Sequence, residues 1–179
     1  MNARRSFRFT AALFGLALAA VFCVAGAAPT VAPQASVTVD YHDPHNFTES
    51  RQAGFGHEYD HGDYLQKLRA FLIQRATPLL APGEHLNITF TNIKLAGGYE
   101  PWRGPLWDDV RFMRDIYPPR FDFTFTLTGA DGQVVRQGTR KLTDLGYLYD
   151  LSPSLYNTDA LAYDKALLGR WLRKGPKHW

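Results

Sequence analysis

The sequence FDFTFTLT, residues 121–128, alternates apolar and polar side chains without a break. Alternation with a period of two predicts a β-strand that buries one face. Because threonine and aspartate occupy the other face, that face meets water, which favours an antiparallel sheet covered on one side only. Residues 129–132, GADG, then predict a tight turn into a partner strand over 134–142.

Two further strands and two helices are predicted around this hairpin. Segments 37–41 and 86–91 also alternate, and the apolar phase slips near Asn92, which indicates a bulge or a strand end. Apolar residues at helical spacing predict one helix from Asp63 to Pro78 and another after a cap at Thr158. Both helices need a surface for their apolar stripes. We therefore predict an α+β fold, with about four mainly antiparallel strands and two helices packed on one face.

The first 27 residues predict export. Arginines at positions 4, 5 and 8 precede a short apolar run, residues 10–24, and Ala25-Gly26-Ala27 supplies the small residues of a cleavage site. This layout is typical of a secretory signal peptide, so we expect cleavage after Ala27 and a periplasmic location. The adjacent arginines leave open whether the general secretory route or the twin-arginine route is used.

Removal of this segment changes the composition. The chain has 20 Lys+Arg and 17 Asp+Glu, and the signal peptide takes three arginines, so 20 − 3 = 17 basic residues remain. A formal charge of zero gives no reason to expect nucleic acid as a partner. The only cysteine, Cys23, leaves too, which excludes disulfides and thiolate chemistry afterwards. We expect a flexible leader over 28–36, a single domain over 37–174 without a transmembrane segment, and a tail over 175–179.

Short motifs in a fixed order connect the chain to a known family. They are Asp43-Pro44, Asn46-Phe47-Thr48, Leu86-Asn87-Ile88, Leu95-Ala96-Gly97, Glu100-Pro101, Pro118-Pro119-Arg120, Leu142-Thr143-Asp144 with Tyr147, and Leu161-Ala162-Tyr163-Asp164-Lys165 through Trp171. On these motifs the chain, from Val37 to Trp171, resembles a family of bacterial periplasmic proteins known as domain of unknown function 3016. Asp164 is a departure, since the family usually has glutamate there. The resemblance implies a periplasmic single-domain protein and assigns no activity.

The loop from Gly97 to Arg120 combines aromatic rings, arginines and carboxylates. Such a composition is typical of recognition surfaces, because tryptophan offers a large contact area at low entropic cost. Another interpretation stays open, in which the rings fill the open end of the core and the charges pair with each other, Asp108 with Arg111 among them. The candidate binding residues are Tyr99, Glu100, Trp102, Arg103 and Trp107, with Arg120 alongside.

Four histidines gather in residues 42–63, which lack an apolar period and predict a long loop. Imidazole and carboxylate groups together suit zinc, copper or nickel, and a loop can gather them without a helix. The alternative is a solvated polar loop without a ligand. The candidate metal ligands are His42, His45, His57 and His61.

Residues 57–61, HEYDH, also match the pattern of zinc proteases. That chemistry needs a helix, so that both histidines grip one zinc ion while the glutamate acts as the base. Glycines at 54, 56 and 62 and the charge of Asp60 argue against a catalytic helix here.

The sequence thus predicts an exported, non-catalytic binding or envelope-accessory module without a cofactor. Its expected partner is a protein or a component of the cell envelope. The alternative is a divalent-metal-binding protein that uses the histidine loop, and the third hypothesis is a zinc-dependent hydrolase. The ligand, the physiological process and the oligomeric state cannot be derived from the sequence.

Overall fold

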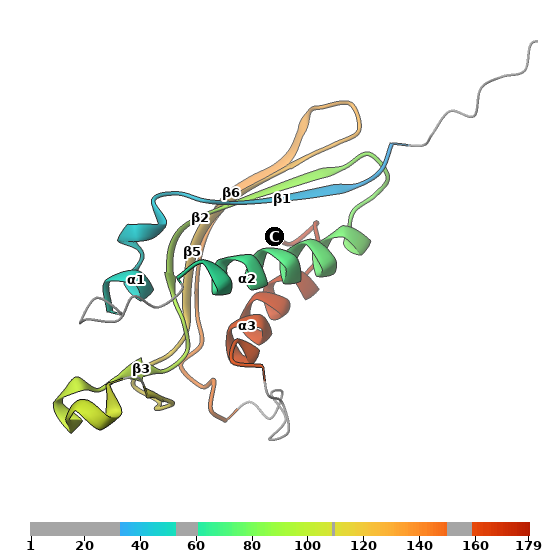
Figure 1. The fold of residues 1–179 in the computed structure, drawn as a ribbon. Coiled ribbons are helices and arrows are strands. Elements are labelled where there is room, and N and C mark those ends of the chain that lie inside the picture. The colour runs from blue at the N-terminus through green and yellow to red at the C-terminus, as the bar shows by residue number, and fades with distance from the viewer. Residues whose placement is uncertain (1–32, 53–60, 109, 150–158) are drawn as a thin grey trace, which may run out of the picture. The chain divides into compact units, whose positions relative to one another are not determined.

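Four strands form one mixed sheet in the order β1-β2-β5-β6 (Figure 1). The structure is a computed structural model that describes residues 33–52, 61–108, 110–149 and 159–179, all within one compact unit, Ala32–Trp179. Phenylalanine, isoleucine and threonine dominate the two central strands, which suits a sheet with one buried face. The four strands are β1 Ser36–Tyr41, β2 His85–Lys94, β5 Arg120–Thr128 and β6 Val134–Thr143.

The sheet is mainly antiparallel, as predicted. β2 pairs antiparallel with β5, and β5 with β6, whereas β1 pairs parallel to β2 with Ser36 opposite His85. The register shifts between Phe90 and Asn92, where the slip of the apolar phase indicated a bulge. Beyond this bulge Ile93 returns to the buried face, opposite Phe121.

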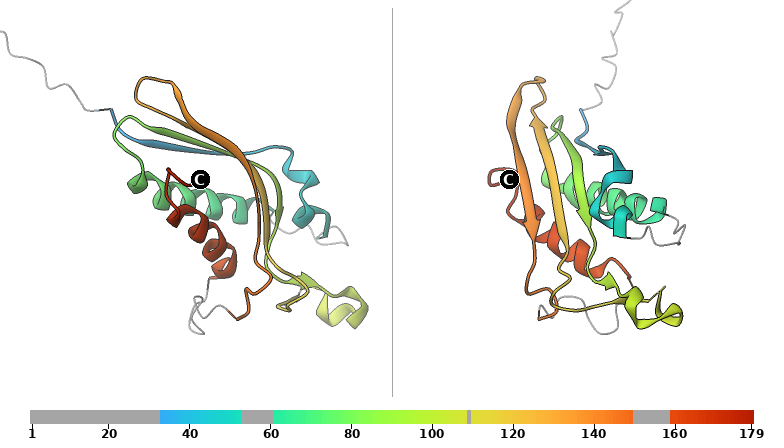
Figure 2. Two further views of the ribbon diagram at one scale, coloured as in Figure 1. Left: turned by 180° about the vertical axis from the view of Figure 1, so that it is seen from behind. Right: turned by 90° about the vertical axis from the view of Figure 1, so that its left-hand side faces the viewer.

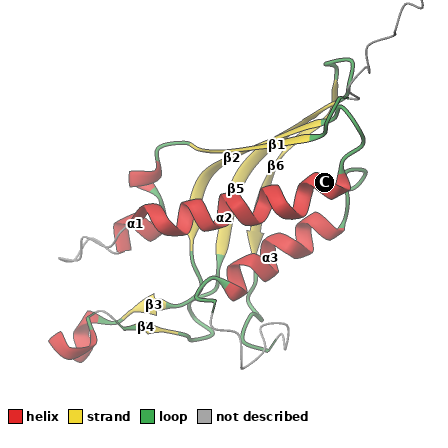
Figure 3. Cartoon of the chain, turned by 45° about the vertical axis from the view of Figure 1, so that its right-hand side comes forward, coloured by secondary structure: helices red, strands yellow, loops and turns green. Residues whose placement is uncertain are grey.

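Helices α2, His61–Ala76, and α3, Ala162–Arg173, lie side by side on one face of the sheet (Figure 3). Their apolar stripes, with Leu68 and Leu72 from α2 and Leu168 from α3, join the apolar face of the sheet in one buried cluster. The predicted fold class is confirmed. A short 3-10 turn, Thr77–Leu79, follows α2 before the chain turns into β2.

Residues 42–63 differ from the long loop that was predicted. They contain a 3-10 turn, Pro44–Asn46, and a short helix, α1, Thr48–Gln52, and α2 begins at His61. Phe47 is fully buried between these two turns, with its ring edge-on to Tyr41 at 6.4 Å between centroids. Elements of one turn are too short to produce an apolar period, which explains why the pattern did not predict them.

Aromatic rings fill the space between the sheet and the helices. Trp171 of α3 meets Phe123 edge-on at 4.8 Å between centroids and Phe125 at 5.8 Å. On β6, Gly138 faces Phe125 so closely that a Cβ atom would lie 3.2 Å from the ring. The guanidinium of Arg140 lies 5.2 Å from the centroid of the same ring, so a cation closes the core at this strand.

A second, two-stranded sheet lies beyond the end of the main one (Figures 1 and 2). Its strands are β3, Gly98–Tyr99, and β4, Arg111–Phe112, and two 3-10 turns, Pro101–Arg103 and Pro105–Trp107, lie between them. We call residues 98–117 the arm. Within the described ranges, we find no helix with the length and apolar character needed to cross a bilayer.

Residues 175–179, expected as a tail, pack against the domain. Trp179 is fully buried, stacks on Trp171 at 5.2 Å between centroids, and donates from Nε1 to the carbonyl of Leu172 at 3.3 Å. Arg136 of β6 donates to the main-chain oxygens of Trp179 and Lys177, both at 2.6 Å. One ring among five residues has no periodicity, so its burial could not be predicted from a pattern.

Replacement of Trp179 by alanine should therefore destabilise the protein. Removing a fully buried tryptophan leaves a cavity, which lowers the free energy of unfolding by about 3–5 kcal/mol. We expect the melting temperature to fall by roughly 10 °C in a thermal scan. The exposed neighbour His178 is the control, because His178→Ala should change stability by less than about 0.5 kcal/mol. Equal melting temperatures for the two variants would contradict the packing described.

Candidate functional site

Buried charges hold the turn that follows β2, residues 95–97. Glu49 of α1 accepts a hydrogen bond from the amide of Leu95 at 2.9 Å, and Asp164 of α3 accepts one from the amide of Ala96 at 3.0 Å. Arg111 of β4 donates to the carbonyl of Ala96 at 3.1 Å and forms an ion pair with Glu49. Three elements distant in sequence therefore meet at one turn, and this turn is the root of the arm.

Burial changes the pKa values of this cluster. Asp164 is 1 % exposed, and burial, only partly offset by the amide of Ala96 and the charge of Arg111, raises its pKa to about 7. Lys94 donates to the carbonyls of Leu95 at 3.2 Å and Gly97 at 3.0 Å, and burial lowers its pKa. Every charged group named here has a polar partner, as buried charges require.

Gly97 allows the turn at residues 95–97 to pack closely against residues 111–113 of the arm. Its φ of +83° is unfavourable for residues with a side chain. A Cβ atom there would lie 2.6 Å from the Sδ of Met113 and 2.9 Å from the Cγ of Arg111. Only glycine therefore fits between the turn and β4.

Inside the arm, Glu100 is the centre of a cluster of charged side chains. It is 1 % exposed, pairs with Arg103, lies 3.0 Å from the Nε of Arg114, and accepts a hydrogen bond from the hydroxyl of Tyr117 at 3.2 Å. Burial acts to raise the pKa of Glu100, but the hydrogen bond from Arg103 and the charges of both arginines outweigh it, so the pKa lies below its usual value. This cluster fixes the arm from within.

The arm exposes an unusual amount of apolar surface. Proline begins each of its two 3-10 turns, and Gly104, with a φ of +103°, joins them. Trp102 is 71 % exposed, Leu106 92 % and Ile116 66 %. Large exposed apolar patches mark interaction sites, whereas single exposed apolar residues are ordinary. The exposed apolar set of the arm comprises Trp102, Leu106, Trp107, Val110, Met113 and Ile116.

Five of the six candidate binding residues lie in this arm. Tyr99 accepts a hydrogen bond from Arg111 at 3.3 Å, and Trp107 lies 6.0 Å from the ring of Phe112. Arg120 lies apart from them, as the exposed first residue of β5, opposite Lys94 and Thr143 in the register.

The interpretation that the rings fill the core and the charges pair holds in part, whereas the recognition surface stays a prediction. The charges do pair with each other, but Arg111 pairs with Glu49 instead of Asp108. The ring of Trp102 does not fill the core, because most of it meets solvent. The charged residues thus shape the arm, and the apolar ones form its surface.

Sequence reasoning missed the residues that fix the root, Glu49 and Asp164, and the most exposed large apolar residue, Leu106. No spacing rule relates Glu49 to Arg111, which are 62 positions apart. Leu106 had a weak signal, since it is a large aliphatic residue between a proline and a tryptophan in a polar loop.

Two of the four candidate metal-binding histidines have no described side chain. His42 and His45 are exposed, His57 lies in the undescribed segment 53–60, and His61 begins α2 without a described side chain. Among the residues that the structure describes, no three His, Cys, Asp or Glu side chains are grouped to hold a metal ion. The protease pattern, residues 57–61, lies mostly outside the described residues. Metal binding and zinc hydrolysis therefore stay predictions.

Comparison with known proteins gives one family and one structural likeness. Residues 35–174 match the family described as "Protein of unknown function (DUF3016)". No curated protein matches. A chain of the PelC dodecamer from Paraburkholderia phytofirmans is 16 % identical, with 80 % of this chain and 92 % of that chain covered, but its TM-score of 0.29 is too low to support any argument.

Asp164 should make stability depend on pH. Its pKa is about 7 in the folded protein and 3.8 ordinarily, so between these values the folded state holds a proton that the unfolded chain releases. The stabilisation is complete below the lower value and is lost as pH rises through the higher one. Asp164→Asn keeps the acceptor for the amide of Ala96 without the charge. We expect the wild type to lose stability relative to this variant between about pH 4 and about pH 7 in urea unfolding, with little further change above that.

Asp131→Asn is the matched control, because Asp131 lies exposed in the turn between β5 and β6. This variant should follow the pH dependence of the wild type. Parallel pH profiles for wild type and Asp164→Asn would show that the buried carboxyl carries no such proton.

Proposed function

This chain belongs to the family of proteins of unknown function DUF3016, and from that premise we propose that it is an exported, non-catalytic module that binds a protein of the cell envelope through the arm. The observation that carries the proposal is an apolar surface held on a built scaffold. Leu106 and Trp102 are more than two-thirds exposed, while the arm beneath them is fixed by the buried carboxylates Glu49 and Glu100.

Fixing such a surface in advance favours tight binding. A flexible loop loses conformational entropy when it binds, whereas a preorganised one avoids most of that cost. The paired 3-10 turns, the β3–β4 ladder and the Glu100 cluster all restrict the arm before any partner arrives. The arm therefore has the properties of a binding element.

The chemistry of the surface favours a protein as the partner. Tryptophan and arginine are enriched among the residues that dominate protein–protein affinity. Residues 98–117 contain three arginines and four acidic residues, 3 − 4 = −1 in formal charge, so the arm is mainly apolar with almost no net charge. Such a surface fits an apolar protein patch with a polar rim.

Export rests on residues 1–27, with their basic start, apolar run and small residues before Ala28. A partner would then be met outside the cytoplasm. No cysteine follows Cys23 in the sequence. The exported chain would therefore have no thiol that an oxidising compartment could alter.

Site-specific photo-crosslinking in the native host tests the proposal. A photoreactive residue at position 106 should form one discrete protein adduct, because Leu106 is the most exposed large apolar side chain of the arm. Trp102→Ser in the same chain should reduce the adduct strongly, since loss of an anchor ring costs about 2 kcal/mol or more, roughly thirtyfold in affinity.

The control places the same photoreactive residue at Val134, which is 54 % exposed at the start of β6. It should give no adduct with that partner. The proposal fails if both positions give the same adducts, or if Trp102→Ser leaves the adduct at position 106 unchanged while the variant remains folded.

A further inference from the structure

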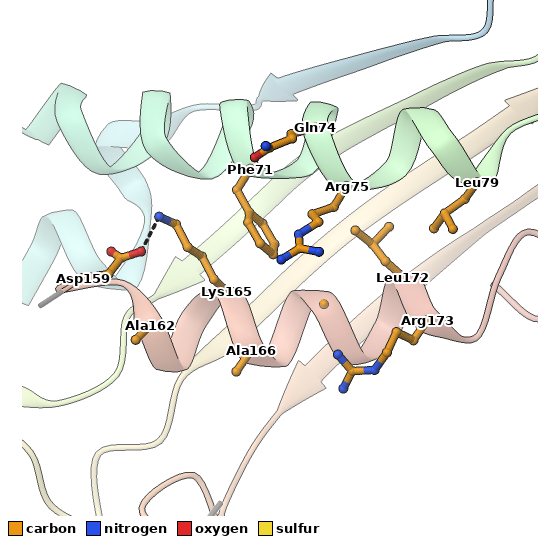
Figure 4. Close-up of a pocket in the computed structure, with 11 residues that line it drawn as sticks. Phe71, Gln74, Arg75, Leu79, Asp159, Ala162, Lys165, Ala166, Leu172 and Arg173 are labelled. Atoms are coloured by element: carbon orange, nitrogen blue, oxygen red, sulfur yellow. Dashed lines mark hydrogen bonds and ion pairs between the residues drawn. The ribbon is translucent and has the colours of Figure 1, made fainter. Parts of the chain in front are cut away.

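A groove of ≈ 530 Å³ lies between α2 and α3 (Figure 4). This volume falls in the range of about 300–1,000 Å³ that small-molecule sites occupy. It involves neither the arm nor its root. Phe71, Gln74 and Arg75 line it from α2, and α3 supplies the opposite wall.

The groove is hollow because α3 presents small residues to α2. Ala162, Ala166 and Gly169 follow each other at helical spacing along the wall. A Cβ atom on Gly169 would lie 3.7 Å from the Cζ of Phe71, which is an ordinary contact distance, so the space at this position would accept a methyl group. Phe71 and Leu172 give the groove an apolar lining.

Two guanidinium groups at the groove have no carboxylate partner among the described residues. These are Arg75 and Arg173, whereas Lys165 is paired with Asp159 at 2.6 Å (Figure 4). The Cζ of Arg75 lies 5.9 Å from the centroid of the Phe71 ring. The Nη1 of Arg173 lies 3.7 Å from the position that a Cβ on Gly169 would take, beside the same ring.

We propose that this groove binds an amphipathic anion. A carboxylate or phosphate head would accept hydrogen bonds from Arg75 and Arg173, whose planar guanidinium groups suit both head types. A short alkyl chain would lie along Phe71 and Leu172. Asp159 pairs with Lys165, and no other acidic side chain lines the groove, so the two arginines give its lining an excess of positive charge.

A simpler role for these arginines is to stabilise helix ends. Both lie in the last turn of their helices, where a cation offsets the partial negative charge of the free carbonyls. That role is independent of any ligand. Binding measurements therefore separate it from a ligand site, whereas a stability measurement alone does not.

Isothermal calorimetry with decanoate and with decyl phosphate, each below its micelle concentration, tests the proposal on the purified protein. At least one should bind saturably with one molecule per chain, and the better binder identifies the head group. Acetate and decanol, which carry only the head or only the chain, should bind at least about tenfold more weakly. Arg75→Gln with Arg173→Gln should weaken the better ligand at least about tenfold.

Matched variants separate the site from general charge and from misfolding. Arg51→Gln with Lys141→Gln removes two exposed charges outside the groove and should leave affinity unchanged. Gly169→Ala should still bind, and Gly169→Leu, which fills the space, should not. The proposal is overturned if neither ligand saturates, or if the two double variants lose affinity equally. It is also overturned if a folded Gly169→Leu variant binds like the wild type.

Discussion

The two central strands place all of their large apolar side chains on one face, and burial of that face constrains the rest of the structure. Phe90, Phe123 and Phe125 are almost completely removed from water, while threonines of the same strands meet solvent on the other side. Burial of such rings is the main favourable term in folding. Both long helices therefore have to lie on the same side. The opposite side needs only polar residues.

A second constraint arises where the covered sheet ends. The turn after β2 has backbone groups that the sheet no longer satisfies, and buried carboxylates from α1 and α3 accept hydrogen bonds from two of its amides. Arg111 neutralises Glu49 and brings β4 to the same place. The arm is thus attached to the core through hydrogen bonds and an ion pair, which need defined geometry, rather than through apolar contacts alone. A surface loop held in this way can present exposed apolar residues in a fixed arrangement.

Strands and helices with a periodic apolar pattern could be predicted from the sequence. Contacts between residues far apart in the sequence could not. The strands at 37–41, 86–91 and 121–128, the bulge near Asn92 and both helix stripes follow from short-range spacing, and the structure has each of them. The composition of the loop from Gly97 to Arg120 also drew attention to the arm. The hydrogen bonds at the root could not be predicted, because Asp164 is 68 positions from the amide that it binds. The main-chain oxygen of Trp179 accepts a hydrogen bond from an arginine 43 positions earlier.

Among the strands that the structure describes, β6 has β5 as its one partner in the main sheet, so its outer side is an edge there. Unpaired edges are templates on which strands of other molecules can add, and this is a route to aggregation. Arg136 and Arg140 lie on the face of β6 that points toward the core, and Lys141 lies on the other face. An incoming strand would have to place its own side chains against these cations. Charged side chains on an edge strand are a feature by which natural sheets oppose edge-to-edge pairing, so the arginines that contact Phe125 and Trp179 would also act against self-association at this edge.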